Sequence, residues 1–296
     1  MKLSFDPGSL LWPLRGQKAQ PAEIALRPTA IDPLYKGKKE YREHMESFTS
    51  ELHDLQRVLY AHQRFSLLLV FQGMDTSGKD GAIRHVMSGV NPQGCSVHSF
   101  KEPSHEELSH DYLWRTTRRL PRRGYIGIFN RSYYEEVLVV KAIPQVLESQ
   151  RLPEGTTRQP HFWADRYRDI RQFEEYLHRN GTRILKFFLH ISKEEQRQRL
   201  LSRVKEPEKH WKISPADLKS RAQWDIFQKV YEECLQNTSH ALAPWYCIPA
   251  DDKRNARLMI SHIIVETLRS LPMAYPESDP AQQAEVEKVR IALENE

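Results

Sequence analysis

The sequence contains little cysteine, and the cysteines that it has form no pattern. Cys95, Cys234 and Cys247 are scattered along the chain, and none belongs to a C-x-x-C pair or stands at a zinc-ligand spacing from a histidine. An odd number of isolated cysteines argues against a disulfide framework and against a structural metal site. We therefore expect three reduced thiols.

Long apolar runs are also missing. No stretch approaches the roughly 18 apolar residues of a membrane-spanning helix. The N-terminal segment MKLSFDPGSLLWPLRG carries Asp6, Pro7 and Pro13 where a signal peptide needs an uninterrupted apolar core. We expect a cytoplasmic protein with no membrane partner.

Repeats and low-complexity tracts are absent as well. The aromatic residues stand mostly at core spacings, and no segment interleaves aromatic with basic residues in the way that stacks nucleic-acid bases. The formal net charge is nevertheless +5, which indicates an anionic partner: nucleic acid, nucleotides, phosphate polymers and anionic membranes all satisfy it. With 296 residues, 39% of them hydrophobic, the chain can bury the core of one large α/β domain.

What the chain does have is a glycine-bracketed loop after a short apolar run. Leu67 to Phe71 is continuous and uncharged, as expected of a parallel strand that is buried on both faces. Gly73, Gly78 and Lys79 then have the G-x-x-x-x-G-K spacing, in which backbone N–H groups turn toward phosphate oxygens and the lysine adds a positive charge. A helix beginning near Asp80 would add its N-terminal partial charge. The segment therefore predicts a phosphate-binding loop rather than a plain turn.

Carboxylates depart from the usual form of this motif. Asp80 stands where a Ser or Thr hydroxyl normally binds magnesium, and Asp75 lies inside the loop. A third apolar strand, residues 125–129, ends in Asn130, where a Walker B strand normally ends in Asp. Glu135 follows shortly after and supplies the missing carboxylate. We expect Asp75 and Glu135 to be the ligands of Mg²⁺.

Arg131 follows the end of that third strand. In open parallel sheets ligands bind beyond the carboxyl ends of the strands, so Arg131 should face the phosphate loop. A guanidinium matches phosphate oxygens with two parallel donors, and we predict that Arg131 clamps a transferring phosphoryl group. The alternative is a structural ion pair.

A basic segment, residues 193–221, is the second notable feature. It holds nine Lys or Arg against five Asp or Glu and contains the charged loop EPEKHWKISP. Because it follows the fourth predicted strand, we interpret it as a lid that closes over a phosphoryl donor and excludes water. A solvated helical hairpin is the alternative.

The remaining elements follow from periodicity and capping residues. An apolar stripe on the helix from Lys38 to about residue 60 indicates core packing or a subunit interface, and the basic segment from Glu106 to Arg123 is predicted to be a helix whose arginines are solvated or hold an anion. We further predict strands at 97–100, 184–191 and 245–249, a loop at 141–160, a helix over 163–177, a helix opened by a Ser192–Glu195 capping box, a helix over 215–236 and a helix through 259–268. The predicted organisation is an extended arm (1–37), one domain (38–271) and an acidic tail (272–296).

The motifs together resemble the family-2 polyphosphate kinases. The resemblance is carried by GMDTSGKDG at 73–81, GVNPQG at 89–94, IFNRSYYEEVLVV at 128–140, KFFLHISKEEQ at 186–196 and EKHWKIS at 208–214. It implies a P-loop kinase fold similar to thymidylate kinase, a three-layer α/β sandwich with a five-stranded parallel sheet and a helical lid. We expect a homo-oligomer, a dimer or tetramer, which the apolar stripe of the 38–60 helix allows, although packing inside one subunit satisfies that stripe equally.

The implied reaction is the reversible, Mg²⁺-dependent transfer of the terminal phosphoryl group of polyphosphate to a nucleotide. Family members restricted to nucleoside diphosphates generally have Asp at the position of Asn130, so this chain resembles the subgroup that acts on both AMP and ADP and forms ATP. The implied catalytic residues are Asp75, Lys79, Asn130, Arg131 and Glu135. The implied phosphate- and nucleotide-binding residues are Gly73, Met74, Thr76, Ser77, Gly78, Asp80, Gly81, Arg84 and Asn91, and those for polyphosphate are Arg199, Arg203, Lys209 and Lys212.

Two other functions fit parts of the sequence. An ATP-dependent nucleoside monophosphate kinase would have the same loop and lid, and only the family motifs argue against it. A basic nucleic-acid-binding protein would fit the net charge but not the placement of the aromatic residues. We therefore expect no nucleic-acid partner.

Overall fold

The structure, a computed structural model, describes residues 3, 5–14 and 23–296. Five strands form one sheet in the order β2-β3-β1-β4-β5, and all neighbouring strands are parallel. The strands are β1 (Ser66–Gln72), β2 (Cys95–Ser99), β3 (Ile126–Asn130), β4 (Thr182–His190) and β5 (Trp245–Pro249). The predicted α/β class and five-stranded parallel sheet are confirmed. Because every strand runs the same way, all five end at one edge of the sheet, called the carboxyl edge below.

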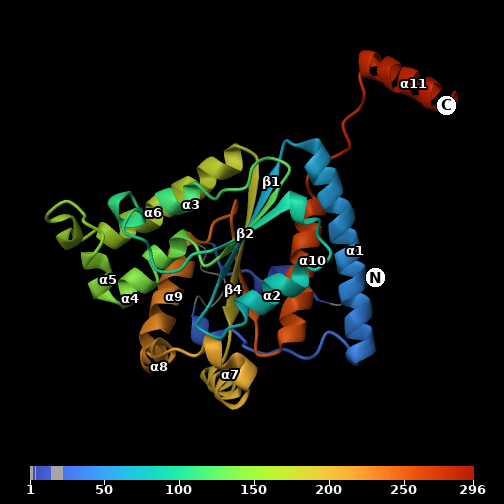
Figure 1. The fold of residues 1–296 in the computed structure, drawn as a ribbon. Helices are drawn as coiled ribbons and strands as arrows, with labels where there is room; N and C mark the ends of the chain where they lie inside the picture. The colour runs from blue at the N-terminus through green and yellow to red at the C-terminus, as the bar shows by residue number, and fades with distance from the viewer. Residues whose placement is uncertain (1–2, 4, 15–22) are drawn as a thin grey trace.

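Helices cover both faces of the sheet and make the three-layer sandwich (Figure 1). On one face α1 (Lys38–His62) packs against α10 (Lys253–Arg269), which in turn packs against α2 (Lys79–Val86). On the other face α6 (Phe162–Arg179) packs against α9 (Trp224–Thr238) and β4. The apolar stripe of α1 is therefore satisfied inside the chain and does not require a second subunit.

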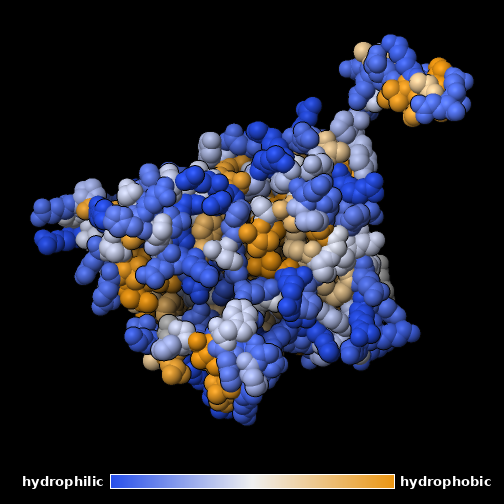
Figure 2. Space-filling view, viewed as in Figure 1, coloured by the Kyte–Doolittle hydropathy of each residue, from blue (hydrophilic) through white to orange (hydrophobic). Residues whose placement is uncertain are grey.

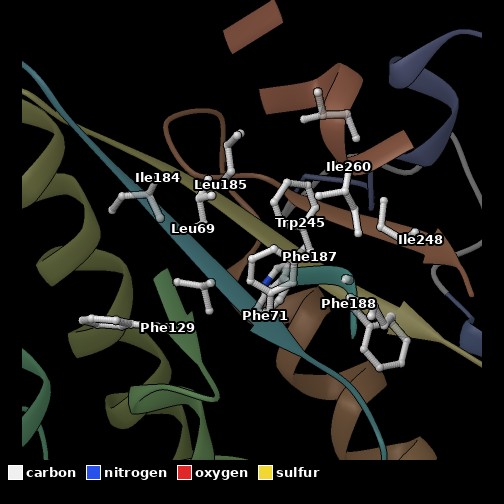
Figure 3. Packing of buried hydrophobic residues seen from close by; sticks show 14 of the residues in the cluster. Leu69, Phe71, Phe129, Ile184, Leu185, Phe187, Phe188, Trp245, Ile248 and Ile260 are labelled. Atoms are coloured by element: carbon white, nitrogen blue, oxygen red, sulfur yellow. The ribbon is translucent and has the colours of Figure 1, made fainter. Parts of the chain in front are cut away.

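The core lies at the middle of the sheet (Figure 3). All seven residues of β1 are buried, and Phe71 packs against Phe187 of β4 with ring centroids 5.2 Å apart. Burying one such side chain contributes roughly 1.5–3 kcal/mol. The register sets Phe71 beside Asn130 of β3, so the end of β1 and the end of β3 lie next to each other.

Beyond the carboxyl edge stand the helices of the predicted lid (Figure 1). They are α7 (Lys193–Lys205), the 3₁₀ helix η7 (Pro207–Lys212) and α8 (Pro215–Ala222). Only half of the predicted capping box forms: Ser192 Oγ accepts a hydrogen bond from the N–H of Glu195 (3.0 Å), whereas the N–H of Ser192 donates to Asp251 (2.8 Å). The predicted helix over 215–236 is interrupted at Gln223, where α8 ends and α9 begins.

Two predictions of local structure are wrong. The basic segment 106–123 is mostly irregular and contains only η4 (Glu107–Ser109) and α3 (Trp114–Thr117). The reason is local: Asp111 accepts from the N–H of Leu113 over 2.9 Å and begins a new turn, a common competitor of the helix. Conversely, the predicted loop 141–160 includes helical turns at α4 (Val139–Ala142) and α5 (Pro144–Glu148), the second opened by a proline at its first position.

The described part of the N-terminal arm packs on the last strand. Its 3₁₀ turns are η1 (Pro7–Leu10) and η2 (Ile24–Leu26). The N–H of Trp12 donates to the carbonyl of Trp245 (2.8 Å), and the Trp12 side chain is fully buried. The rest of the predicted arm, residues 1–2, 4 and 15–22, lies outside the described residues.

The tail forms α11 (Pro280–Glu294), which extends away from the body and buries none of its residues (Figure 1). Within the described residues, no helix is both long and apolar enough to cross a bilayer.

Candidate active site

The predicted phosphate-binding loop, residues 73–79 and called the phosphate loop below, lies between β1 and α2 at the carboxyl edge. Gly73 and Gly78 have φ values of +152° and +100°, which L-residues with a side chain rarely adopt. A Cβ atom on Gly73 would also stand only 2.8 Å from the carbonyl oxygen of Leu189. Thr76, a non-glycine residue, has φ +65°. The loop is therefore held in a strained, closely packed conformation, as is common where a protein binds a ligand.

Lys79 is buried beneath this loop. Its Nζ donates to the carbonyl oxygens of Gly73 (2.7 Å) and Met74 (3.2 Å) and to Ser77 Oγ (3.4 Å). Burial, and next the charge of Arg131, lower the pKa of Lys79 to about 8. An ammonium group that is poorly solvated and held only by neutral oxygens is well placed to interact with phosphate oxygens.

Arg131 joins the phosphate loop to the end of β3. Its Nη2 donates to Asp75 Oδ1 over 2.9 Å, and its Nη1 approaches Glu135 Oε2 at 3.4 Å. Glu135 is the main cause of the raised pKa of Arg131. Arg131 also has φ +63°, a left-handed conformation that is unusual for a non-glycine residue. This turn directs the guanidinium from the end of β3 to the loop.

Asn130 and Asp80 form a second link across the same gap. Asn130 Nδ2 donates to Asp80 Oδ1 over 2.6 Å. The two departures from the usual motif, an Asp after the lysine and an Asn at the end of β3, are therefore partners in one hydrogen bond. The neutral amide at position 130 places no second negative charge beside Asp80.

The predicted metal ligands are together, but they do not form a closed metal cage. Asp75 and Glu135 are both partly exposed and are bridged by Arg131. Within the described part of the chain, no group of three or more His, Cys, Asp or Glu side chains is arranged to hold a metal. Mg²⁺ in phosphoryl-transfer sites is bound by one or two carboxylates together with water and substrate phosphates. The carboxylates of Asp75 and Glu135 fit that mode of Mg²⁺ binding.

The structure brings most of the predicted loop residues to this site, with one exception. The loop or the first turn of α2 contains Met74, Thr76, Ser77 and Gly81, and Arg84 is exposed one turn further along α2.

Asn91 is the exception and is not at the site. It precedes β2, at the opposite, amino edge of the sheet, where its side chain accepts from the N–H of Gln93 and its backbone bonds to Gln56. Its contacts are those of a turn.

Arg199 also differs from its predicted place in a polyphosphate channel. It is buried at the base of the lid, and its donors are all used: by Glu195 (2.6 Å) and by four backbone carbonyls. Those carbonyls belong to Thr76 (3.0 Å), Ser77 (2.9 Å), Ala250 (2.6 Å) and Asp251 (3.1 Å). In this conformation Arg199 connects the lid to the phosphate loop instead of lining an open surface.

The other three predicted lid cations lie further out. Arg203 faces Asp217 at 3.7 Å and donates to the carbonyl of Lys212 (3.2 Å). Lys209 pairs with Glu206, and the ammonium of Lys212 lies over the ring of Trp211 at 4.8 Å. Trp211 itself is 79% exposed. These cations stay at the surface of the lid.

Three residues next to the site were not predicted from the sequence. Gln196 of α7 donates to the carbonyl of Asp75 (3.2 Å), and Gln72 at the end of β1 donates to Glu135 (2.9 Å). Tyr231 of α9 is buried beside Arg131 and Glu135, and burial raises its pKa well above the usual value. Gln72 could have been found as the polar residue that follows the apolar run and precedes the loop. Gln196 and Tyr231 reach the site only through the fold.

A buried ionic network supports the Arg131 turn from behind. Lys186 and Glu174 are fully buried and 2.8 Å apart. Glu174 Oε1 accepts from the hydroxyls of Tyr133 (2.8 Å) and Tyr134 (2.7 Å), while His240 lies 2.9 Å from Glu174 Oε2. Tyr133 and Tyr134 stand between Arg131 and Glu135 in the chain. The network therefore fixes the segment that carries both of these site residues.

Comparisons with known proteins point to one family. A model of the family described as Polyphosphate kinase 2 (PPK2) matches residues 35–275. The chain is 54% identical over 276 residues to "ADP-polyphosphate phosphotransferase" of Rhodopseudomonas palustris, covering 93% of this chain and 96% of the relative. It is 46% identical over 250 residues to "AMP/ADP-polyphosphate phosphotransferase" of Meiothermus ruber, covering 83% and 88%. The crystal structure of polyphosphate kinase 2 from Arthrobacter aurescens TC1 superposes with a TM-score of 0.84 at 33% identity, covering 97% of this chain and 99% of that one.

Proposed function

The chain belongs to the polyphosphate kinase 2 family, and on that premise we propose that it transfers the terminal phosphoryl group of inorganic polyphosphate to ADP and to AMP, reversibly. The observation that carries the proposal is the meeting of three side chains at the ends of β1 and β3. Lys79 donates to the backbone of the loop that contains Asp75, and Arg131 donates to the carboxylate of Asp75. The names of the relatives support the donor and both acceptors.

The chemistry needs charge neutralisation more than proton transfer. A nucleotide phosphate is largely ionised at pH 7, because its second pKa is about 6, and so it attacks without a general base. The loop N–H groups and Lys79 hold the phosphates in line, which lowers the entropic part of the barrier. Arg131 exchanges its carboxylate partners for the oxygens of the transferring group and stabilises the charge that spreads over them.

Asp75 and Glu135 are the residues that would hold Mg²⁺. The ion, when bound, neutralises phosphate charge alongside the two cations. When Arg131 turns to the phosphates it releases both carboxylates, so the same movement frees the metal ligands. The link from Gln196 to the carbonyl of Asp75 keeps the loop in place during that exchange.

The lid supplies the donor side of the site. Arg203, Lys209 and Lys212 line the path of the polymer over the phosphate loop, and closure excludes the water that would otherwise accept the phosphoryl group. Arg199 does not line that path. It donates to the carbonyls of Thr76 and Ser77 and so couples the position of α7 to the phosphate loop.

A comparison of phosphoryl donors tests the proposal. Purified protein with Mg²⁺ and AMP is incubated with polyphosphate in one reaction and with ATP in another, and nucleotides are separated by chromatography. We expect ADP, and then ATP, to form only in the reaction that contains polyphosphate. Formation of ADP only when ATP is the donor would identify an ordinary monophosphate kinase and overturn the proposal.

A further inference from the structure

Arginines without ion-pair partners gather at the amino edge of the sheet, opposite the phosphate loop. Three segments meet there: residues 55–65, 112–125 and 176–183, none of which contains an Asp or Glu. Backbone hydrogen bonds join them, from the N–H of Gly124 to the carbonyl of Phe65 (2.7 Å) and from the N–H of Ser66 to the carbonyl of Gly181 (3.1 Å). The segments carry nine arginines, of which Arg115 pairs with Glu107 (3.6 Å). The other eight are called the edge arginines below: Arg57, Arg64, Arg118, Arg119, Arg122, Arg123, Arg179 and Arg183.

The edge arginines differ from the three arginines of α7 in the lid. Arg197, Arg199 and Arg203 of the lid each face a carboxylate, whereas none of the eight edge arginines has an ion-pair partner among the described residues. All but Arg183 are exposed. In Figure 2 the upper rim of the molecule, above β1, is predominantly hydrophilic. Like charges gathered without counter-charges destabilise a fold by mutual repulsion, so such a surface points to an anionic ligand.

We propose that the edge arginines bind a remote stretch of the same inorganic polyphosphate chain whose end reacts at the phosphate loop. The inference rests on the proposed function for the identity of the polymer. The seven residues of β1 separate the two edges, a distance of about 20 Å at roughly 3.3 Å per residue, which a long linear polymer can span over the surface. Guanidinium groups match phosphate oxygens with paired donors.

A second observation at the same edge is a shallow hollow of about 230 Å³. Gln56, Arg57, Tyr60, Asn91 and Tyr275 line it. Arg57 and the side-chain amide of Asn91 are donors that suit phosphate oxygens, whereas the amide of Gln56 is buried and donates to the carbonyl of Asn91 (2.9 Å). The hollow lies where the predicted nucleotide residue Asn91 was found.

The proposed function is the reason for choosing inorganic polyphosphate over nucleic acid at this edge. Tyr125 has the guanidinium of Arg122 over its ring (3.9 Å) and packs against Tyr60 (5.6 Å), and Phe65 has Arg183 over its ring (5.5 Å). Tyr60, Tyr176 and Tyr275, in the same segments or in the hollow, are exposed. Because bases of single-stranded nucleic acids stack on open aromatic rings, single-stranded RNA is the competing ligand that the test includes.

Tethering a long donor at the edge arginines raises the local concentration of its reactive end. The benefit depends on chain length, because a donor of a few phosphates reaches one edge only. Long polyphosphate should therefore have a much lower KM than a short donor, with the same kcat.

A charge-matched pair of variants tests this. The edge variant combines Arg57→Gln, Arg64→Gln, Arg119→Gln and Arg179→Gln; these four exposed side chains make no hydrogen bond, ion pair or ring contact with described residues. The control combines Lys38→Gln, Arg42→Gln, Arg158→Gln and Lys229→Gln, which are also exposed and remove the same charge elsewhere. Equal melting temperatures would show that both variants are folded.

For the edge variant we expect the KM for long polyphosphate to rise roughly tenfold, while kcat and the KM values for tripolyphosphate and ADP stay within about twofold. Its equilibrium binding of long polyphosphate, measured without nucleotide, should show a log–log salt slope smaller by about 3. Equal losses in the control, or no loss in either variant, would overturn the inference. Tighter binding of single-stranded RNA than of polyphosphate at the same arginines would overturn it as well. The binding measurement still tests the surface if no phosphoryl transfer occurs, which separates its failure from failure of the proposed function.

Discussion

The guanidinium of Arg131 donates a hydrogen bond to Asp75, 2.9 Å away, although Asp75 follows β1, Arg131 follows β3, and the two residues are 56 positions apart in the chain. The link forms because β1 and β3 are adjacent and parallel and end together. Arg131, the cation that we assign to the transferring phosphoryl group, is therefore paired with Asp75, a carboxylate that we assign to Mg²⁺. Substrate binding would separate the pair and make both groups available.

Arg131→Lys should lower kcat by about 10²- to 10³-fold, because one ammonium cannot bridge two oxygens as the planar guanidinium does. Initial rates of ATP formation from ADP and long polyphosphate measure the effect. Arg158→Lys, an exposed position, is the matched control and should retain full activity. A kcat within about threefold of wild type for Arg131→Lys would remove Arg131 from the proposed mechanism.

Asn130→Asp should lower the ratio of kcat/KM for AMP to that for ADP. It would also place a second carboxylate 2.6 Å from Asp80, which destabilises the protein because the two charges repel each other. The double variant Asn130→Asp, Asp80→Asn exchanges the partners and should restore the melting temperature while keeping the altered ratio. An unchanged ratio in both variants would show that position 130 does not set the acceptor range.

The pH dependence should report Lys79. The free enzyme holds Lys79 as a cation below its pKa of about 8 and as a neutral amine above it. Because the cation binds phosphate, kcat/KM for polyphosphate should fall as the pH rises through about 8. Bound phosphate raises the pKa again, so kcat should stay level to a higher pH. A kcat/KM that stays level well above pH 8 would contradict this assignment.

Breaking the Glu174–Lys186 pair should destabilise the fold. Lys186→Met leaves the fully buried Glu174 without its closest cation, and such a loss costs about 3–5 kcal/mol. Urea unfolding measures it. The double variant Lys186→Met, Glu174→Gln should recover part of the loss, because no unpaired charge remains. A free energy of unfolding unchanged by Lys186→Met would show that the network is not needed to hold the Tyr133–Tyr134 segment.

Much of the fold could be predicted because buried parallel strands are continuous apolar runs. WYCIP at 245–249 forms β5 with the predicted bounds, and the strand before the phosphate loop was equally clear. The segment 106–123 failed since a charge-rich sequence has no apolar stripe to separate a helix from irregular structure. There the arginines stack on Phe100, Trp114 and Tyr125 instead.

The site was predictable only as far as residues lie close to a motif in the chain. Asp75, Lys79 and Arg131 come together because each follows the end of a neighbouring strand. Asn91 could have been placed correctly, since it precedes its strand and so belongs to the amino edge. Gln196 lies on a helix far along the chain, and no local pattern shows that its amide reaches the carbonyl of Asp75.

The most direct test follows radiolabelled phosphate from polyphosphate to ADP, with wild-type protein and Lys79→Ala measured in parallel. We predict labelled ATP with the wild type and no label above background with Lys79→Ala, whose circular dichroism spectrum should match that of the wild type. Labelled ATP formed at comparable rates by both proteins, or by neither, would contradict the conclusion that the loop around Lys79 transfers phosphoryl groups from polyphosphate.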